Sequence, residues 1–260
     1  MKTNRFSLVL ESLTELASEI DAAHADPRPA LPLLSEVLTE LGPLPANALF
    51  LGLADDGLPV LLDLRDSVPG PLLVAGDAQV GKTAFLQTVA LAAARVHDPN
   101  NVQFGIVTDT PQEWESLGSL PHLLGVYNTQ DNEAADFITS LHHWAHENRQ
   151  TSQYILLLID ELADIGGENF KASQALRWLF LRGPSRRVWP IVTLTGDRAG
   201  QVLPWLDFFR TRIFGKMQPS NSREHLVRED TRDLDSLLAN AQFALREGRG
   251  WLRFWIPQMD

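Results

Sequence analysis

Residues 76 to 83 read Gly76-Asp77-Ala78-Gln79-Val80-Gly81-Lys82-Thr83, and the fold follows from this stretch. It matches the pattern G-x-x-x-x-G-K-[ST] of a phosphate-binding loop, or P-loop. The apolar residues 72–75 predict a short buried strand before the loop, and the Ala- and Leu-rich residues 82–96 predict a helix after it. A loop in this position turns backbone N–H groups and the positive end of the helix towards a phosphate. The sequence therefore predicts a nucleotide-binding site.

The residues of the loop have separate expected roles. We expect nine residues to contact the nucleotide: Gly76, Asp77, Ala78, Gln79, Val80, Gly81, Lys82, Thr83 and Ala84. The ammonium group of Lys82 is expected to reach the β- and γ-phosphates, and the hydroxyl of Thr83 to hold Mg²⁺. Asp77 is unusual, because a carboxylate in an anion-binding loop weakens phosphate binding unless its side chain points to solvent.

A second motif supplies acidic groups. Residues 154–159 form an unbroken apolar run that predicts a buried parallel strand, and Asp160 and Glu161 follow it directly. Ligands of such sheets bind at the carboxyl ends of the strands. We therefore expect Asp160 to hold the water shell of Mg²⁺ and Glu161 to orient and deprotonate the water that attacks the γ-phosphate. The alternative is a strand that ends in a solvated turn. Together with Lys82, the motif favours an ATPase.

The order of landmarks along residues 50–257 resembles the FtsK/SpoIIIE/HerA class of ring-forming P-loop motors. Beside the two motifs, the landmarks are a hairpin over 51–64, a strand over 104–109, Pro121-His122-Leu123-Leu124, a strand over 191–195, Thr211-Arg212-Ile213-Phe214, Ser222-Arg223 and Gly248-Arg249-Gly250. The resemblance implies a RecA-like α/β core with a mostly parallel sheet flanked by helices. It also implies ATP and Mg²⁺ as ligands and a ring of identical subunits, for example a hexamer.

The resemblance further implies an arginine that acts on the ATP of the neighbouring subunit. Arg212 is the first candidate for this role and Arg223 is the second. One position departs from the class, which usually has a polar sensor of the γ-phosphate, often Gln, after the threonine at 195. Gly196 stands there, and Asp197 and Arg198 are the polar residues that follow it.

The transported substrate is open at this stage. The class implies translocation of double-stranded DNA, together with a partner nuclease or a membrane component. Polypeptide transport or remodelling is one alternative, and a nucleotide switch that moves nothing is another, favoured by Asp77 and Gly196. The net charge of −11 argues against a broad DNA-binding face. Arg182, Arg186 and Arg187 precede a strand and predict either a basic loop in a ring pore or ion pairs with a neighbour.

Composition limits the remaining classes. A chain of 260 residues can form one sizeable core, and the absence of cysteine excludes disulfides and thiolate metal sites. His142, His143 and His146 predict either a metal pair or, as we prefer, a polar helix face. No apolar run approaches the ~20 residues that span a bilayer, and the start of the chain does not resemble a signal peptide. We expect a cytoplasmic protein.

The chain is predicted to have two parts, an N-terminal helical segment over 1–42 and an ATPase domain over 43–260. An apolar stripe predicts a first helix over 8–20, prolines interrupt residues 25–32, and a second helix is expected over 33–41 before Gly42. These helices either cover their own ATPase domain, as we prefer, or dock on a partner.

Three further elements are predicted around the core. Residues 133–147 and 170–181 carry apolar stripes that predict helices packed on the sheet. Residues 250–256 predict a last strand that closes the sheet, with its tryptophans packed in the core rather than stacked on a base.

Overall fold

The computed structural model describes residues 31–148, 151–165, 171–219, 221–227, 234–247 and 250–260. Residues 1–31 and 32–260 form two separate units, and the structure described below is that of the second unit. The predicted helix over 8–20 and the proline-containing segment up to residue 30 lie outside the described residues. The predicted boundary after residue 42 falls inside the second unit, because the helix before it packs on the sheet domain.

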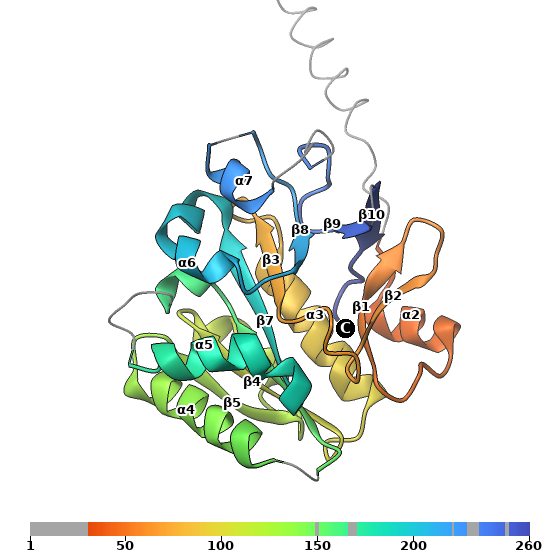
Figure 1. Cartoon of the computed structure of the whole chain (residues 1–260). Helices are drawn as coiled ribbons and strands as arrows, with labels where there is room; N and C mark the ends of the chain where they lie inside the picture. Colours follow the sequence, from red (N-terminus) through yellow and green to blue (C-terminus); the bar gives the residue numbers. More distant parts are fainter. Residues whose placement is uncertain (1–30, 149–150, 166–170, 220, 228–233, 248–249) are drawn as a thin grey trace, which may run out of the picture. The chain divides into compact units, whose positions relative to one another are not determined.

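One ten-stranded sheet forms the centre of this unit (Figure 1). Its strands are β1 (Ala48–Ala54), β2 (Pro59–Asp63), β3 (Leu72–Gly76), β4 (Val102–Thr108), β5 (Leu123–Asn128), β6 (Tyr154–Ile159), β7 (Val188–Thr195), β8 (Thr211–Phe214), β9 (Gln242–Glu247) and β10 (Gly250–Trp255). The spatial order is β2-β1-β10-β9-β8-β3-β7-β6-β4-β5. The run from β8 to β5 is parallel, and the pairs from β8 to β2 are antiparallel. The predicted, mostly parallel RecA-like α/β fold is confirmed.

The helices are α2 (Leu34–Leu41), α3 (Lys82–Val96), α4 (Asn132–Glu147), α5 (Ser173–Arg182), α6 (Leu203–Leu206) and α7 (Asn221–Leu226). Helices α4 and α5 cover one face of the parallel strands, and α3 lies on the other face (Figure 1). The helices predicted over 82–96, 133–147 and 170–181 correspond to α3, α4 and α5. Pattern and structure agree here because each helix has one apolar face against a sheet.

Strand β6 shows how the sequence builds two core layers. All six of its residues are buried. Ile155, Leu157 and Ile159 pack on the α4 and α5 side, whereas Leu156 and Leu158 pack on the α3 side. Because successive side chains of a strand point to opposite faces, a strand covered on both faces must be apolar throughout. This burial holds the chain rigidly up to Asp160.

The C-terminal strand was predicted correctly, but its expected place at the closing edge of the sheet is wrong. Strand β10 pairs with β9 on one side and with β1 on the other. The hairpin of β1 and β2 adds outside β10, so that β2 and β5 are the edge strands. Trp251 packs edge-on against Phe214, with ring centroids 5.6 Å apart, which agrees with the predicted packing role of the tryptophans.

Helix α2 is the predicted second helix, and it packs on its own domain as we preferred. Leu34 and Val37 are buried against Phe50 of β1 and Ala92 of α3. The helix ends at Gly42, whose φ of 68° suits a residue without a side chain.

Candidate nucleotide-binding site

The two motifs meet at the carboxyl ends of neighbouring strands. The P-loop follows β3, the two acids follow β6, and β7 lies between these strands in the sheet. Parallel strands end at the same edge, so the loop after β3 and the acids after β6 face each other across the end of β7. A cavity of about 600 Å³ lies there. Its lining includes Lys82, Thr83, Asp160 and Glu161.

The P-loop has the backbone that its glycines predict. Gly81 has a φ of 92°, and a Cβ atom built on it would lie 2.8 Å from Cα of Asn240. Asn240 donates its backbone N–H to the carbonyl of Val80 at 2.9 Å, so the turn before β9 packs directly on the loop. A side chain at position 81 would therefore disturb both the loop conformation and this contact.

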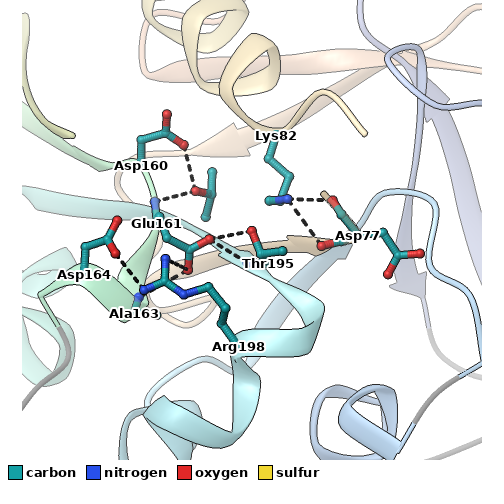
Figure 2. Close-up of polar contacts among 10 residues, drawn as sticks. Asp77, Lys82, Asp160, Glu161, Ala163, Asp164, Thr195 and Arg198 are labelled. Atoms are coloured by element: carbon teal, nitrogen blue, oxygen red, sulfur yellow. Dashed lines mark hydrogen bonds and ion pairs between the residues drawn. The ribbon is translucent and has the colours of Figure 1, made fainter. Parts of the chain in front are cut away.

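Lys82 points back into the loop. Its Nζ donates to the carbonyl oxygens of Asp77 at 2.7 Å and Gly76 at 3.3 Å (Figure 2). The residue is buried, with 8% of its surface exposed. Burial lowers the pKa of Lys82, and the nearby carboxylates of Glu161 and Asp160 oppose that shift. Among the described residues, the hydrogen-bond partners of this ammonium group are these two loop carbonyls, and a phosphate would compete with them for it.

The carboxylate of Asp77 points away from Lys82 (Figure 2). One of its oxygens accepts the backbone N–H of Gln218 at 2.8 Å, and the Asp77 N–H donates to the carbonyl of Lys216 at 3.0 Å. The acid therefore ties the P-loop to the segment after β8 instead of facing a phosphate. This contact explains why an acidic residue is compatible with an anion-binding loop.

Asp160 and Thr83 have the donor set that Mg²⁺ prefers. The Thr83 hydroxyl donates to one carboxylate oxygen of Asp160 at 2.9 Å, and the Thr193 hydroxyl donates to the other at 2.9 Å. Burial raises the pKa of Asp160, although the hydrogen bonds from Thr193 and Thr83 oppose this. A buried carboxylate beside a hydroxyl suits a hard divalent cation that prefers oxygen ligands.

We expect Asp160→Asn to stabilise the fold while it removes the cation ligand. Because the pKa of Asp160 is raised in the folded state, its folded form favours the protonated acid. Stability from this group is present at acidic pH and is lost as pH rises through the folded pKa. At neutral pH the asparagine should raise the free energy of unfolding by roughly 0.5–2 kcal/mol, because it buries no charge. Its Oδ1 can accept from the Thr193 hydroxyl, and its Nδ2 can donate to the Thr83 hydroxyl, which then reverses its role.

Urea unfolding of both proteins at several pH values tests this expectation. The gain should shrink as pH falls through the raised pKa of Asp160, because the wild-type carboxyl then binds its proton. If Asp160→Asn is less stable than the wild type at pH 8, burial of the Asp160 carboxylate does not destabilise the fold, and the expectation is wrong.

Glu161 is held in one position by the residues around it. Its oxygen Oε2 accepts the Thr195 backbone N–H at 2.9 Å and the Thr195 hydroxyl at 2.5 Å, and Oε1 accepts the N–H of Ala163 at 3.3 Å (Figure 2). The backbone of Glu161 has a φ of 78°, which is uncommon for a residue with a side chain. Its N–H donates to the Thr193 hydroxyl at 2.7 Å. Strain of this kind is maintained only where surrounding contacts enforce it, which is typical of functional sites.

Arg198 brings a second cation into the cavity from the turn that follows β7. Its Nη2 lies 2.7 Å from Oδ1 of Asp164, and its Nη1 lies 3.9 Å from Oε1 of Glu161. Among the described residues that line the cavity, Lys82 and Arg198 are the cationic ones, beside the acids Asp109, Glu113, Asp160, Glu161 and Asp164. This excess of negative charge favours entry of a nucleotide as its complex with Mg²⁺.

Arg212 lies apart from this cavity. Its guanidinium donates to the backbone carbonyls of Leu206 and Leu226, both at 2.7 Å, and of Phe209 at 3.1 Å. The side chain therefore joins β8 to the segments around α6 and α7. These contacts favour a structural role, and the role in the neighbouring subunit's site stays a prediction. The side chain of Arg223, the second candidate, lies outside the described part of the structure.

We expect Arg212→Ala to destabilise the fold by roughly 2–4 kcal/mol, because it leaves partly buried carbonyls without their charged donor. The midpoint of urea unfolding measures this, with Arg65→Ala as the control, since Arg65 pairs with Asp63 on an exposed surface. An unchanged midpoint, combined with turnover that recovers when Arg212→Ala and Lys82→Ala subunits are mixed, would instead support the role in trans.

The other predicted polar clusters lie elsewhere. Among the described residues no group of three or more His, Asp or Glu side chains could hold a metal ion. The choice between a histidine pair that binds metal and a polar face of α4 stays a prediction. His142 packs edge-on against Trp178, with ring centroids 4.8 Å apart. Arg182, Arg186 and Arg187 do not line the cavity.

Sequence reasoning missed Thr193, Thr195, Asn240 and the contacts of Arg198. The threonines had a signal, because alternate residues of one strand point to the same face and both stand at its carboxyl end. Asn240 had none, since it follows the P-loop by more than 150 residues and reaches it through strand pairing.

Comparisons with known proteins agree with this geometry. The sequence model of the FtsK/SpoIIIE family matches residues 46–156, which include the P-loop and the first half of β6. In this region the chain is similar to P-loop ATPases of the FtsK/SpoIIIE family. The ESX-1 secretion system protein EccCb1 of Mycobacterium tuberculosis is 30% identical to it over 83 residues, which are 32% of this chain and 14% of that protein.

Two solved structures have the same fold. EccC (ATPases 2 and 3) of Thermomonospora curvata in complex with a signal sequence peptide matches 89% of this FtsK/SpoIIIE-like chain and 43% of its own, with a TM-score of 0.68 and 14% identity. A chain described as an ATPase matches over 88% of this chain and 96% of its own, with a TM-score of 0.69 and 15% identity. The chain thus spans only a small part of the secretion protein and less than half of the EccC structure. No helix in the described part of the chain is long and apolar enough to cross a membrane.

Proposed function

We propose that this FtsK/SpoIIIE-like protein binds Mg·ATP in the cavity between the P-loop and β6 and hydrolyses it. One observation supports this most directly: the ammonium of Lys82, the Thr83 and Asp160 pair and the carboxylate of Glu161 all line that cavity. In this proposal Lys82 exchanges the carbonyls of Gly76 and Asp77 for phosphate oxygens. Thr83 and Asp160 hold Mg²⁺, which neutralises phosphate charge.

In the proposed hydrolysis, Glu161 acts as the general base. A water oxygen forms a bond to the γ-phosphorus, while the bond from that phosphorus to the bridging oxygen of ADP breaks. The proton of the water passes to the Glu161 carboxylate. Thr195 orients this carboxylate through two donors to one oxygen, and the other oxygen accepts the N–H of Ala163 and lies 3.9 Å from Nη1 of Arg198.

We infer that the protein works as a ring of identical subunits that moves a polypeptide. Support for this substrate class comes from the similarity to EccC, whose structure contains a signal sequence peptide, and to a secretion system protein. The net charge also supports a polypeptide substrate. The chain has 33 Asp and Glu residues and 22 Lys and Arg residues, and this negative excess opposes binding to a polyanion such as DNA.

Double-stranded DNA, which the resemblance led us to expect first, is the second candidate. One observation favours it: Arg182, Arg186 and Arg187 lie together in and after the end of α5. Arg182 and Arg186 are exposed, so a ring could collect several such groups around a pore.

ATPase rates measured with and without duplex DNA, and with and without an unfolded polypeptide, separate the two substrates. The oligomeric state is measured in the same samples by light scattering. We expect nucleotide-dependent assembly and a rate that rises with the polypeptide. A rate that rises with DNA alone, and falls when Arg182, Arg186 and Arg187 are changed to Ala, would overturn the polypeptide proposal. Absence of ATP binding would overturn the whole function.

A further inference from the structure

In the class of motors that the sequence resembles, a polar residue directly after the strand-end threonine senses the γ-phosphate. Gly196 stands at that position here and has no side chain. A Cβ atom at Gly196 would lie 2.9 Å from the methyl carbon of Met217 and 3.6 Å from Oδ1 of Asp77, at the start of the P-loop. The adjacent Thr195 is engaged with Glu161 through both its N–H and its hydroxyl. Neither residue supplies a positive group to the cavity.

Arg198 is in the place to supply that group. It belongs to the 3₁₀ turn that runs from Gly196 to Val202, directly after β7, and it lines the same cavity as Lys82 and Thr83. Figure 2 shows its guanidinium between Glu161 and Asp164, on the far side of Glu161 from Asp160. About a third of the side chain is exposed, so it can change partners without unpacking a core.

We propose that Arg198 senses the γ-phosphate in cis, by exchanging the carboxylate of Asp164 for the γ-phosphate of ATP. The inference rests on the proposed binding of ATP in this cavity. Asp164 is then a competitor that holds the guanidinium when the γ-phosphate is missing. The exchange also moves the cation away from Oε1 of Glu161, which keeps its hydrogen bond from Ala163 and can accept a second one from water.

The geometry explains how Arg198 could both detect the γ-phosphate and control the access of water to Glu161. Arg198 contacts Glu161, the acid expected to activate water, and Asp164, whose other oxygen, Oδ2, is buried without a hydrogen-bond partner in the described structure. A guanidinium presents several donors in a fixed plane, which suits a phosphate as well as a carboxylate. Its position is coupled to Glu161 through Thr195, because that residue immediately precedes the turn and binds the same carboxylate.

Two substitutions should shift nucleotide preference in opposite directions. Binding of ADP and of a non-hydrolysable ATP analogue is titrated with excess Mg²⁺ by calorimetry. Arg198→Ala should weaken binding of the analogue by about 10- to 100-fold, the scale of charge-assisted hydrogen bonds, and change ADP binding by less than about twofold. Asp164→Asn should raise the preference for the analogue over ADP by roughly 3- to 10-fold, because the competitor for Arg198 is weakened.

The double variant and a matched control complete the test. Combined with Arg198→Ala, Asp164→Asn should lose its effect on the preference, since there is no guanidinium left to release. Arg65→Ala, which breaks an exposed Arg–Asp pair outside the cavity, should change neither affinity.

The possible outcomes distinguish failure of the Arg198 inference from failure of the proposed ATP binding. If both substitutions move the preference in the same direction, or if Arg198→Ala weakens ADP and the analogue equally, Arg198 is structural and the inference fails. If the wild type binds neither nucleotide, the proposed function fails instead, whatever the variants do.

Discussion

Changing Lys82 to alanine should lower the affinity for Mg·ATP by at least ~100-fold and remove detectable binding in a calorimetric titration. The loop supplies this one side-chain cation to the phosphates, and a charge-assisted contact to each of two phosphates accounts for a loss of this size. The fold should persist, because the ammonium is desolvated and its removal relieves a cost of burial.

Lys171→Ala is the matched control, since Lys171 is an exposed lysine that bonds the side chain of Asn132. It should bind Mg·ATP like the wild type. Unchanged affinity in the Lys82 variant, with a normal circular dichroism spectrum, would show that the nucleotide binds elsewhere.

Glu161→Gln should separate binding from chemistry. Turnover is expected to fall by ~10²-fold or more, the scale for loss of a general base, while Mg·ATP affinity stays within about threefold. The glutamine is nearly the same shape, and its carbonyl oxygen can accept both donors of Thr195 in place of Oε2. Single-turnover hydrolysis and a binding titration of the same preparation measure the two effects.

The control for this substitution is Glu40→Gln on the exposed face of α2, which should hydrolyse ATP at the wild-type rate. Near wild-type turnover in Glu161→Gln would mean that Glu161 is not the general base, and Asp164 or Asp197 would become the candidates for that role. A wild type that binds ATP without hydrolysing it would favour the nucleotide switch over a motor.

Much of the fold was accessible from the sequence because its signals are local. The elements over 72–96 and 154–159 were predicted almost to the residue, since an apolar strand, a glycine loop and a helix with one apolar face each have their own pattern. The order of strands was less accessible. Strand β9 was not predicted, although it pairs with β10, which follows it closely in the chain. Strand β10 was placed at the edge, because its pairing with the distant β1 leaves no mark in either segment alone.

The sequence by itself determined the nucleotide loop, the two acids after β6 and the class of fold, because these depend on residues adjacent in the chain. Only the tertiary structure decided which side chains meet there. Strand β7 lies between β3 and β6, which brings Thr195 to Glu161 and carries Arg198 to Asp164. The tertiary structure also places Arg212 among backbone carbonyls, outside the cavity. The physical reason is that strand pairing across long stretches of chain sets these distances, whereas sequence patterns record only the face that each element buries.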